Sequence, residues 1–83
     1  MPQGINIIIR YDKTLQEITG TAEDPARLSS NSIFAWLLEC ILMEYPEIEE
    51  KYPPGTLYFQ VNGYTPKSYS PLFDGDEIYF GVV

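Results

Sequence analysis

The fold is decided by TLYFQVNG at residues 56–63 and PLFDGDEIYFGVV at residues 71–83. In each stretch, apolar residues alternate with other residues at the period of two that is typical of a half-buried strand. The positions predicted to face the core are Leu57, Phe59, Val61, Ile78, Phe80 and Val82. Asn62-Gly63 and Asp74-Gly75-Asp76 predict turns, because Gly and Asn tolerate the positive φ that tight turns need. The sequence therefore predicts two strands of one sheet, with the last strand in its middle.

A hairpin is predicted near the start of the sequence. Ile5–Tyr11 is rich in β-branched residues and is predicted to be the first strand. Asp12-Lys13 is predicted to be a turn. Leu15 to Ala22 is then predicted to be a second strand, although Gly20 interrupts its alternation. Glu23 to Ser30 is predicted to be a polar connection.

A helix is predicted to follow that connection and to end near Tyr45, where Pro46 stops it. Ser30, Asn31 and Ser32 are the candidate N-caps, since a short side-chain oxygen can accept from free backbone N–H groups. With a turn of about 100° per residue, the apolar stripe consists of Phe34, Leu37, Leu38, Ile41, Leu42 and Tyr45. We expect this stripe to cover the apolar face of the sheet.

The opposite side of the same helix carries Trp36 and Met43, where a surface helix would normally be charged. Two interpretations are open. In the first, both side chains tuck under Glu23–Ser30 or are covered by Glu47–Tyr52. In the second, they form a face for a partner or for self-association.

The segment after the helix, residues 46–55, is predicted to hold one short helical turn and then a rigid loop. It contributes to an acidic cluster of Glu44, Glu47, Glu49 and Glu50. A cluster of this kind can resemble a metal site, but hard cations need oxygens that converge from a tight loop. The interpretation that we favour is a solvated charged face.

Composition places residues 1–83 in one globular domain, with 45% hydrophobic residues and a net charge of −7. Such an acidic chain repels phosphate backbones, so nucleic acid is excluded as a partner. The sequence contains neither an apolar run long enough to span a membrane nor a signal peptide, so we expect no membrane association. The single cysteine, Cys40, fits a reducing cytoplasm.

The absence of histidine narrows the chemistry further. With no His and one Cys, the usual zinc sites, four-cysteine iron–sulfur clusters and imidazole triads are all excluded. The carboxylates and tyrosines form no recognisable catalytic pair. We therefore expect a protein that is not an enzyme, with no catalytic residues, no cofactor and no metal.

Several motifs resemble those of the small sulfur-carrier proteins of the MoaD and ThiS families. The apolar helix ending in Tyr45-Pro46, the turn Val61-Asn62-Gly63 and the segment from Pro71 to Ile78 are similar to the corresponding motifs in those families. The resemblance extends from about Ser32 to Phe80. It implies an α+β fold, the ubiquitin-like β-grasp, with a mixed sheet of four to five strands packed on one α-helix.

The end of the sequence departs from the family pattern. Those carriers continue into a flexible tail ending Gly-Gly, whose carboxylate is adenylated and converted to a thiocarboxylate. Here the sequence reads Gly81-Val82-Val83, and branched valines are stiff. Two explanations are open: the chain is a relative that is not a carrier, or the native protein continues beyond Val83. The leading interpretation is a non-catalytic interaction module, a small subunit of a cofactor-related enzyme complex. The alternative is a sulfur carrier, similar to the small subunit of molybdopterin synthase, in molybdenum or tungsten cofactor biosynthesis.

A partner surface is predicted on the sheet face away from the helix. In a ubiquitin-like order the first strand lies beside the last, and the last beside the third. That order gathers Ile8, Arg10, Tyr58, Gln60 and Tyr79 on one exposed face. Tyrosines there would suit a protein partner, an activating enzyme or a synthase large subunit. The competing interpretation is a tyrosine ladder that only stabilises the sheet. Further candidate contacts are Trp36, Met43, Gly81, Val82 and Val83, and a homodimer is a further option.

Overall fold

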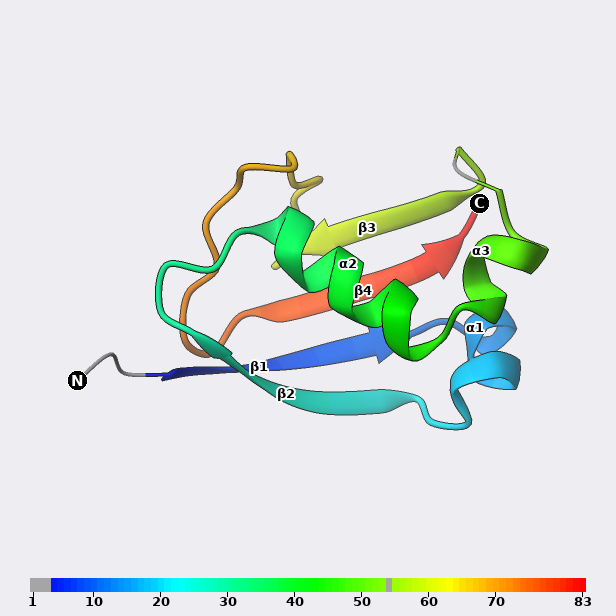
Figure 1. Cartoon of the computed structure of the whole chain (residues 1–83), viewed down its shortest axis with the longest axis horizontal. Helices are drawn as coiled ribbons and strands as arrows, with labels where there is room; N and C mark the ends of the chain where they lie inside the picture. The colour runs from blue at the N-terminus through cyan, green and yellow to red at the C-terminus, as the bar shows by residue number, and fades with distance from the viewer. Residues whose placement is uncertain (1–3, 54) are drawn as a thin grey trace.

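The computed structural model describes residues 4–53 and 55–83. The described part of the chain contains four strands and three helices (Figure 1). In chain order they are β1 (Gly4–Tyr11), α1 (Lys13–Thr19), β2 (Glu23–Ser29), α2 (Phe34–Glu44), α3 (Glu47–Lys51), β3 (Leu57–Val61) and β4 (Glu77–Val82).

The four strands form one mixed sheet in the order β2-β1-β4-β3. β1 pairs with β2 antiparallel and with β4 parallel, and β3 pairs with β4 antiparallel. Figure 1 shows α2 lying across one face of this sheet. The predicted α+β class is confirmed, and so is the placement of the last strand between the first and the third. The sheet packs on the one long helix that was predicted, α2, and the short helices α1 and α3 lie at one end of the sheet.

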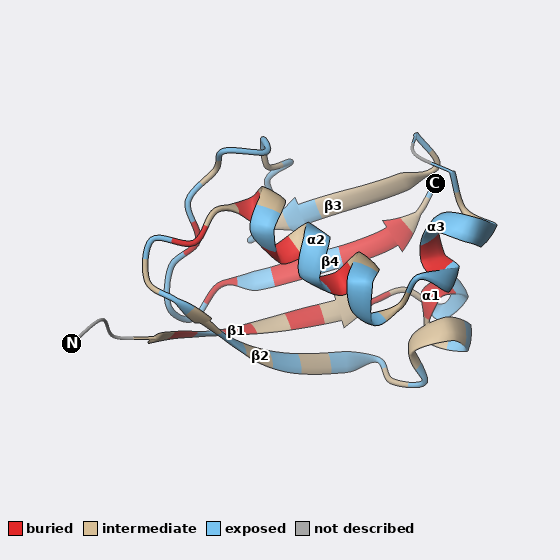
Figure 2. Ribbon diagram, viewed as in Figure 1, coloured by how far each residue is buried: buried red, intermediate tan, exposed pale blue. Residues whose placement is uncertain are grey.

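The core lies between the sheet and α2, and strand alternation determines which side chains enter it (Figure 2). On β1 the alternate positions Ile5, Ile7 and Ile9 are buried, as in a half-buried strand. The predicted helix stripe also faces the core. Phe34, Leu37 and Ile41 are buried, and Leu38, Leu42 and Tyr45 are partly buried against the same cluster.

A row of aromatic rings runs through this core from α2 to β1. Phe34 and Phe59 meet edge to face with centroids 5.3 Å apart, and Phe59 and Phe80 do so at 4.5 Å. The row continues through Phe80 and Tyr11 at 6.3 Å and ends with Tyr11 and Tyr45 at 6.2 Å. Edge-to-face pairs add stabilisation beyond the area that they bury, so the row ties the helix to three strands.

The strand predicted at Leu15–Ala22 is wrong. The chain forms α1 there, because Asp12 caps the helix by accepting a hydrogen bond from the Leu15 N–H at 2.8 Å. Gly20 ends the helix with a φ of 74°, a left-handed conformation that glycine adopts without strain. The glycine that interrupts the predicted strand is therefore a helix C-cap.

The polar connection predicted at Glu23–Ser30 is also wrong, since Glu23–Ser29 is the edge strand β2. Ala26 and Leu28 pack against the core, while Pro25 and the charged residues are tolerated because the strand has a partner on one side only. The hairpin thus exists, with a helix in its connection and its second strand later in the sequence than predicted.

The predicted N-caps of the main helix are wrong as well. α2 starts at Phe34 after Ile33, and no side chain caps it. The Ser32 hydroxyl donates instead to the carbonyl of Ser29 at 2.6 Å. The first helical N–H groups find backbone partners far along the chain. The N–H of Phe34 donates to the Ser70 carbonyl and that of Ala35 to the Ser68 carbonyl, each at 2.9 Å.

The predicted short helical turn after Pro46 is confirmed as α3. Its Ile48 is fully buried, so this five-residue helix closes the end of the core next to α1. Among the described residues, no helix is long and apolar enough to cross a membrane.

Candidate protein-binding surface

The open face of the sheet, away from α2, brings together the five residues predicted to share it. In the strand register, Arg10 lies opposite Tyr79, and Tyr79 lies opposite Gln60. Tyr58 lies opposite Gly81, and Ile8 lies two residues before Arg10, on the same face. We call Ile8, Arg10, Tyr58, Gln60 and Tyr79 the open-face cluster.

Two tyrosines form the centre of the open-face cluster. The rings of Tyr58 and Tyr79 stack with centroids 5.9 Å apart and an interplanar angle of 26°. Tyr58 lies directly over Gly81, where an added Cβ would sit 2.7 Å from the ring. Burial raises the pKa of the Tyr58 phenol, and the neighbouring Tyr79 raises it further. The missing side chain at Gly81 therefore lets Tyr58 lie flat on the sheet, and Tyr79 remains 38% exposed beside it.

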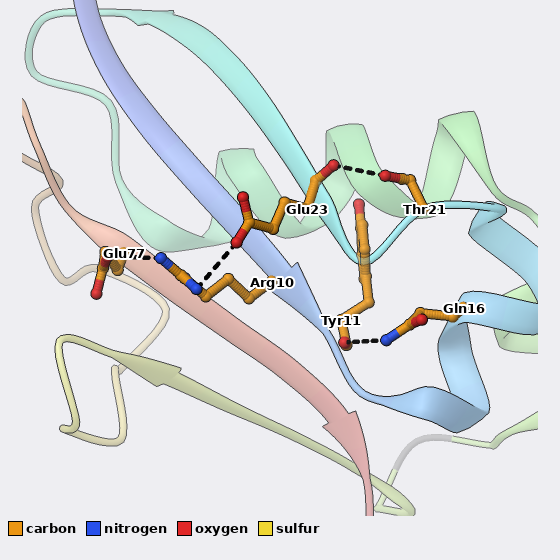
Figure 3. A network of polar contacts seen from close by, with 6 residues as sticks. All are labelled: Arg10, Tyr11, Gln16, Thr21, Glu23 and Glu77. Atoms are coloured by element: carbon orange, nitrogen blue, oxygen red, sulfur yellow. Dashed lines mark hydrogen bonds and ion pairs between the residues drawn. The ribbon is translucent and has the colours of Figure 1, made fainter.

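A charged network borders the tyrosines (Figure 3). Arg10 lies between Glu23 of β2 and Glu77 of β4, and its guanidinium contacts each carboxylate at 3.0 Å. These ion pairs are exposed, so they contribute little to stability but hold the Arg10 side chain in one direction. Glu23 and Glu77 are not among the predicted site residues. Glu23 lies on β2, a strand predicted earlier in the sequence at Leu15–Ala22, and Glu77 lies on β4, where the parallel register with β1 brings it beside Arg10.

Other contacts in the same network fix the connection between β1 and β2. The Gln16 side-chain amide donates to the Tyr11 carbonyl at 3.0 Å, and the Thr21 hydroxyl donates to the Glu23 carbonyl at 2.7 Å (Figure 3). A hollow of about 420 Å³ adjoins the cluster, lined by Arg10, Gln60, Asn62, Gly63, Glu77, Ile78 and Tyr79. The open face is thus a surface whose side chains are held by stacking and ion pairs, next to a polar depression.

Trp36 and Met43 lie on a separate surface. They are 64% and 78% exposed on α2, which covers the other side of the sheet, and Cys40 is exposed there too. The interpretation that they tuck under Glu23–Ser30 or beneath Glu47–Tyr52 is wrong, because α2 turns this side to solvent. The structure does not bring them together with the open-face cluster.

The last residues continue the sheet, as predicted. Val82 is the final residue of β4, and its N–H donates to the Asp12 carboxylate at 2.8 Å. The Val83 N–H donates to the Thr56 carbonyl at 2.7 Å, although the Val83 side chain is 84% exposed. Gly81 is buried beneath Tyr58. These contacts hold Gly81, Val82 and Val83 in place at one end of the open face.

The described residues contain no group of three His, Cys, Asp or Glu side chains that could hold a metal ion. The pKa shift is large at a buried tyrosine, Tyr11. Burial raises the pKa of the Tyr11 phenol, and the negative charge of Asp24 and the neighbouring Tyr45 raise it further. Tyr45 has its pKa raised by the same causes, burial first and Asp24 next. Both hydroxyls sit 3.5 Å from one Asp24 oxygen, an arrangement suited to holding strands and helix together.

No protein-family model and no curated protein matches the sequence, but several solved structures match the chain. A protein assigned as molybdopterin converting factor subunit 1 from Pyrococcus furiosus has a TM-score of 0.84 at 19% identity, covering 94% of this chain and 97% of that one. Small archaeal modifier protein 1 from Haloferax volcanii has a TM-score of 0.79 at 13% identity, covering 94% and 97%. A ubiquitin from Caldiarchaeum subterraneum has a TM-score of 0.66 at 15% identity, covering 98% and 95%. The fold is the ubiquitin-like β-grasp.

The turn after β3 and the segment before β4, whose sequences resemble sulfur-carrier motifs, are structural parts of this β-grasp. The buried Asp76 carboxylate accepts hydrogen bonds from the Asn62 side chain and the Phe73 N–H, both at 2.8 Å. Asn62, at a φ of 52°, accepts in turn from the Glu77 N–H at 3.0 Å. Asp74 accepts from the Asn6 N–H at 2.7 Å. The turn after β3 and the corner before β4 therefore lock together and set the register of the open face.

Proposed function

We propose that residues 1–83 form a single ubiquitin-like domain that is not an enzyme and acts by binding another protein through the open-face cluster. The observation that carries this proposal is the Tyr58–Tyr79 stack over Gly81. Stacked tyrosines supply rigid contact area at a small entropic cost, as interfaces favour. Their hydroxyl groups and the oriented Arg10 add polar contacts at the edge of that area.

The partner that we propose is an activating enzyme or the large subunit of a cofactor-related synthase. The fold similarity to a molybdopterin converting factor subunit supports this choice. The competing interpretation is that the stacked tyrosines only stabilise the strands, as cross-strand aromatic pairs do. We also propose a cytoplasmic location, since the single cysteine is exposed and a reducing compartment would protect it.

The test uses Tyr79→Glu, with Tyr64→Glu as the matched control at another exposed tyrosine. Each protein, immobilised, is exposed to a lysate of the native organism, and the captured proteins are identified by mass spectrometry. We expect one partner to be captured by the wild type and by Tyr64→Glu but lost with Tyr79→Glu, with all three melting at similar temperatures. Equal capture by all three, or unfolding of Tyr79→Glu alone, would support the stabilising interpretation instead.

A sulfur carrier is the second candidate, favoured by that same structural similarity. This role needs a C-terminal carboxylate that an activating enzyme can adenylate. Incubation with ATP, a sulfur donor and the activating enzyme, followed by intact-mass measurement, tests it. Replacement of one oxygen by one sulfur supports the carrier role, and an unchanged mass removes it.

Self-association through Trp36 and Met43 is compatible with either role. Their exposure on the same side of α2 is the supporting observation, because exposed large apolar groups often mark contacts. Light scattering at high protein concentration tests it. A dimer that Trp36→Glu dissociates supports the proposal, and a monomer at every concentration excludes it.

A further inference from the structure

The outer edge of β3 has backbone groups that the sheet does not use. β3 ends the strand order, and no described strand pairs with its outer side (Figure 1). The Val83 N–H donates to the Thr56 carbonyl, and the Asn62 N–H donates to the Glu77 carbonyl. The backbone N–H and C=O groups of the even-numbered residues of β3 therefore point toward β4. Hydrogen bonding alternates along an antiparallel strand, so the odd-numbered Leu57 and Phe59 direct their N–H and C=O groups outward.

The far end of this edge is closed. Val61, the next odd-numbered residue, exchanges two backbone hydrogen bonds with Tyr64, at 2.7 and 3.0 Å. That exchange confirms the alternation, because these bonds lie on the side away from β4. The open part of the edge is therefore short, with four backbone groups on two residues.

An apolar groove runs beside the same edge, between β3 and α2. Two adjoining hollows of about 300 and 470 Å³ share Leu38, Leu42 and Phe59 as their walls. Leu57 lines the end near α3, and Pro66 lines the other end. β3 residues on this side are only partly buried (Figure 2). A strand laid along the edge would place alternate side chains in the groove.

The groove is acidic at both ends. Glu49 lines the hollow near α3, and Glu39 lines the hollow near Pro66. Neither carboxylate is in an ion pair among the described residues, where Arg10 makes both recorded pairs. With a net charge of −7, the chain offers these positions no surplus of positive charge. An occupant with basic residues would complement the groove.

We propose that the outer edge of β3 binds an extended segment of a partner protein as an added antiparallel strand. Two apolar residues, separated by one residue, lie opposite Phe59 and Leu57 and enter the groove. Basic residues that flank this pair, where the segment leaves the edge of β3, reach Glu39 and Glu49. The groove and its two carboxylates therefore favour a short strand with basic, apolar, apolar and basic residues at alternate positions. Its backbone forms four hydrogen bonds with Leu57 and Phe59.

The probe is a seven-residue peptide, Lys-Thr-Ile-Thr-Val-Thr-Lys, titrated into the intact protein by calorimetry. Methylating the backbone nitrogen of Ile or Val removes a donor to β3, whereas methylating the central Thr changes a donor that points away. We expect the first change to weaken binding at least about tenfold and the second to have a much smaller effect. Equal weakening by both, or no binding of the parent peptide, overturns the proposal.

A charge reversal supplies an independent check at exposed positions. Glu39→Lys/Glu49→Lys is expected to weaken the Lys peptide about tenfold at low salt and to strengthen a peptide with Glu at both ends. Glu17→Lys, a charge reversal at an exposed position of α1, is expected to leave peptide affinity unchanged. An unaltered preference for the Lys peptide in the double variant, or loss of binding with Glu17→Lys, overturns the proposal. Because the peptide probes the edge of β3 and not the open-face cluster, failure here leaves the open-face proposal intact.

Discussion

The Asp12 carboxylate accepts a hydrogen bond from the backbone N–H of Val82, 70 positions later in the sequence. Its other oxygen accepts from the Leu15 N–H at the start of α1, and the Asp12 N–H donates to the Phe80 carbonyl. The Asp12 side chain thus caps α1. Together with its backbone N–H, this side chain also extends the pairing of β1 with β4 beyond Tyr11, the last residue of β1. The end of β4 is held by this contact and by Thr56 on its other side.

Asp12→Ala is expected to lower the free energy of unfolding by about 1 to 3 kcal/mol, because a helix cap and a strand contact are lost together. Glu17→Ala, at an exposed position of the same helix, is the control and is expected to change stability by less than about 0.5 kcal/mol. Urea unfolding measures both. Equal, small effects would mean that the Asp12 contacts contribute little in solution.

Gly81→Ala is expected to displace the Tyr58 ring, since the new methyl group would lie 2.7 Å from it. The expected loss is about 1 kcal/mol or more, together with a change in the near-ultraviolet circular dichroism of the tyrosine stack. In a Tyr58→Ala background the same change should cost nothing or stabilise, because Ala suits a strand better than Gly. Identical costs in both backgrounds would show that the ring does not depend on the glycine.

Asp76→Ala is expected to destabilise the protein by about 1 to 3 kcal/mol, because two hydrogen-bond donors lose their buried acceptor. Asp74→Ala removes one exposed acceptor in the same corner and is expected to cost less. Thermal unfolding compares the two. The reverse order of stability would contradict the assigned role of Asp76 in joining the turn to the corner.

Tyr11 gives the protein a stability that depends on pH. Its folded-state pKa is raised by burial, so an unfolded chain releases this proton near pH 10, at about the ordinary tyrosine value, while the folded chain keeps it. The contribution is complete below that pH and is lost as the pH rises further. Denaturant unfolding from about pH 8 to about pH 11 should show a shallower decline for Tyr11→Phe than for the wild type. Tyr69→Phe, at an exposed ring, should decline as the wild type does.

Strands with regular alternation were predicted correctly from the sequence. The predictions were wrong for segments whose structure depends on a helix cap or on pairing with another strand. Leu15–Ala22 contains β-branched residues, but Asp12 and Gly20 supply a cap at each end and make α1. Both signals are local, because a capping Asp and a terminal Gly mark helix ends in the sequence itself. Glu23–Ser29 has two inward apolar residues and a proline, so its strand character depends on pairing with β1.

The start of α2 could not be predicted locally. Three candidate caps precede it, yet its first N–H groups bond to carbonyls of Ser68 and Ser70. Only the folded path of residues 64–70 places those carbonyls there. Local capping preferences are real but weak, and a tertiary contact replaced them.

The open-face cluster was predictable because a period of two assigns each residue to a face and the resemblance supplied the strand order. Its internal geometry was not. The Tyr58 ring over Gly81 and the two carboxylates around Arg10 depend on register across three strands. The acidic groove at the edge of β3 joins residues from α2, α3 and β3, which no single stretch of sequence brings together.

β1 and β4 lie side by side in the centre of the sheet, although they are the first and last strands along the sequence. During synthesis, β1 emerges first and must wait for its parallel neighbour. Until residues 77–82 leave the ribosome, the isoleucines of β1 have β2 on one side and no strand on the other. Because the contacts between β1 and β4 join residues about 70 positions apart, the central pair of strands can form only late in synthesis. A nascent chain that lacks residues 77–82 would expose β1, its most apolar strand, to chaperones and proteases.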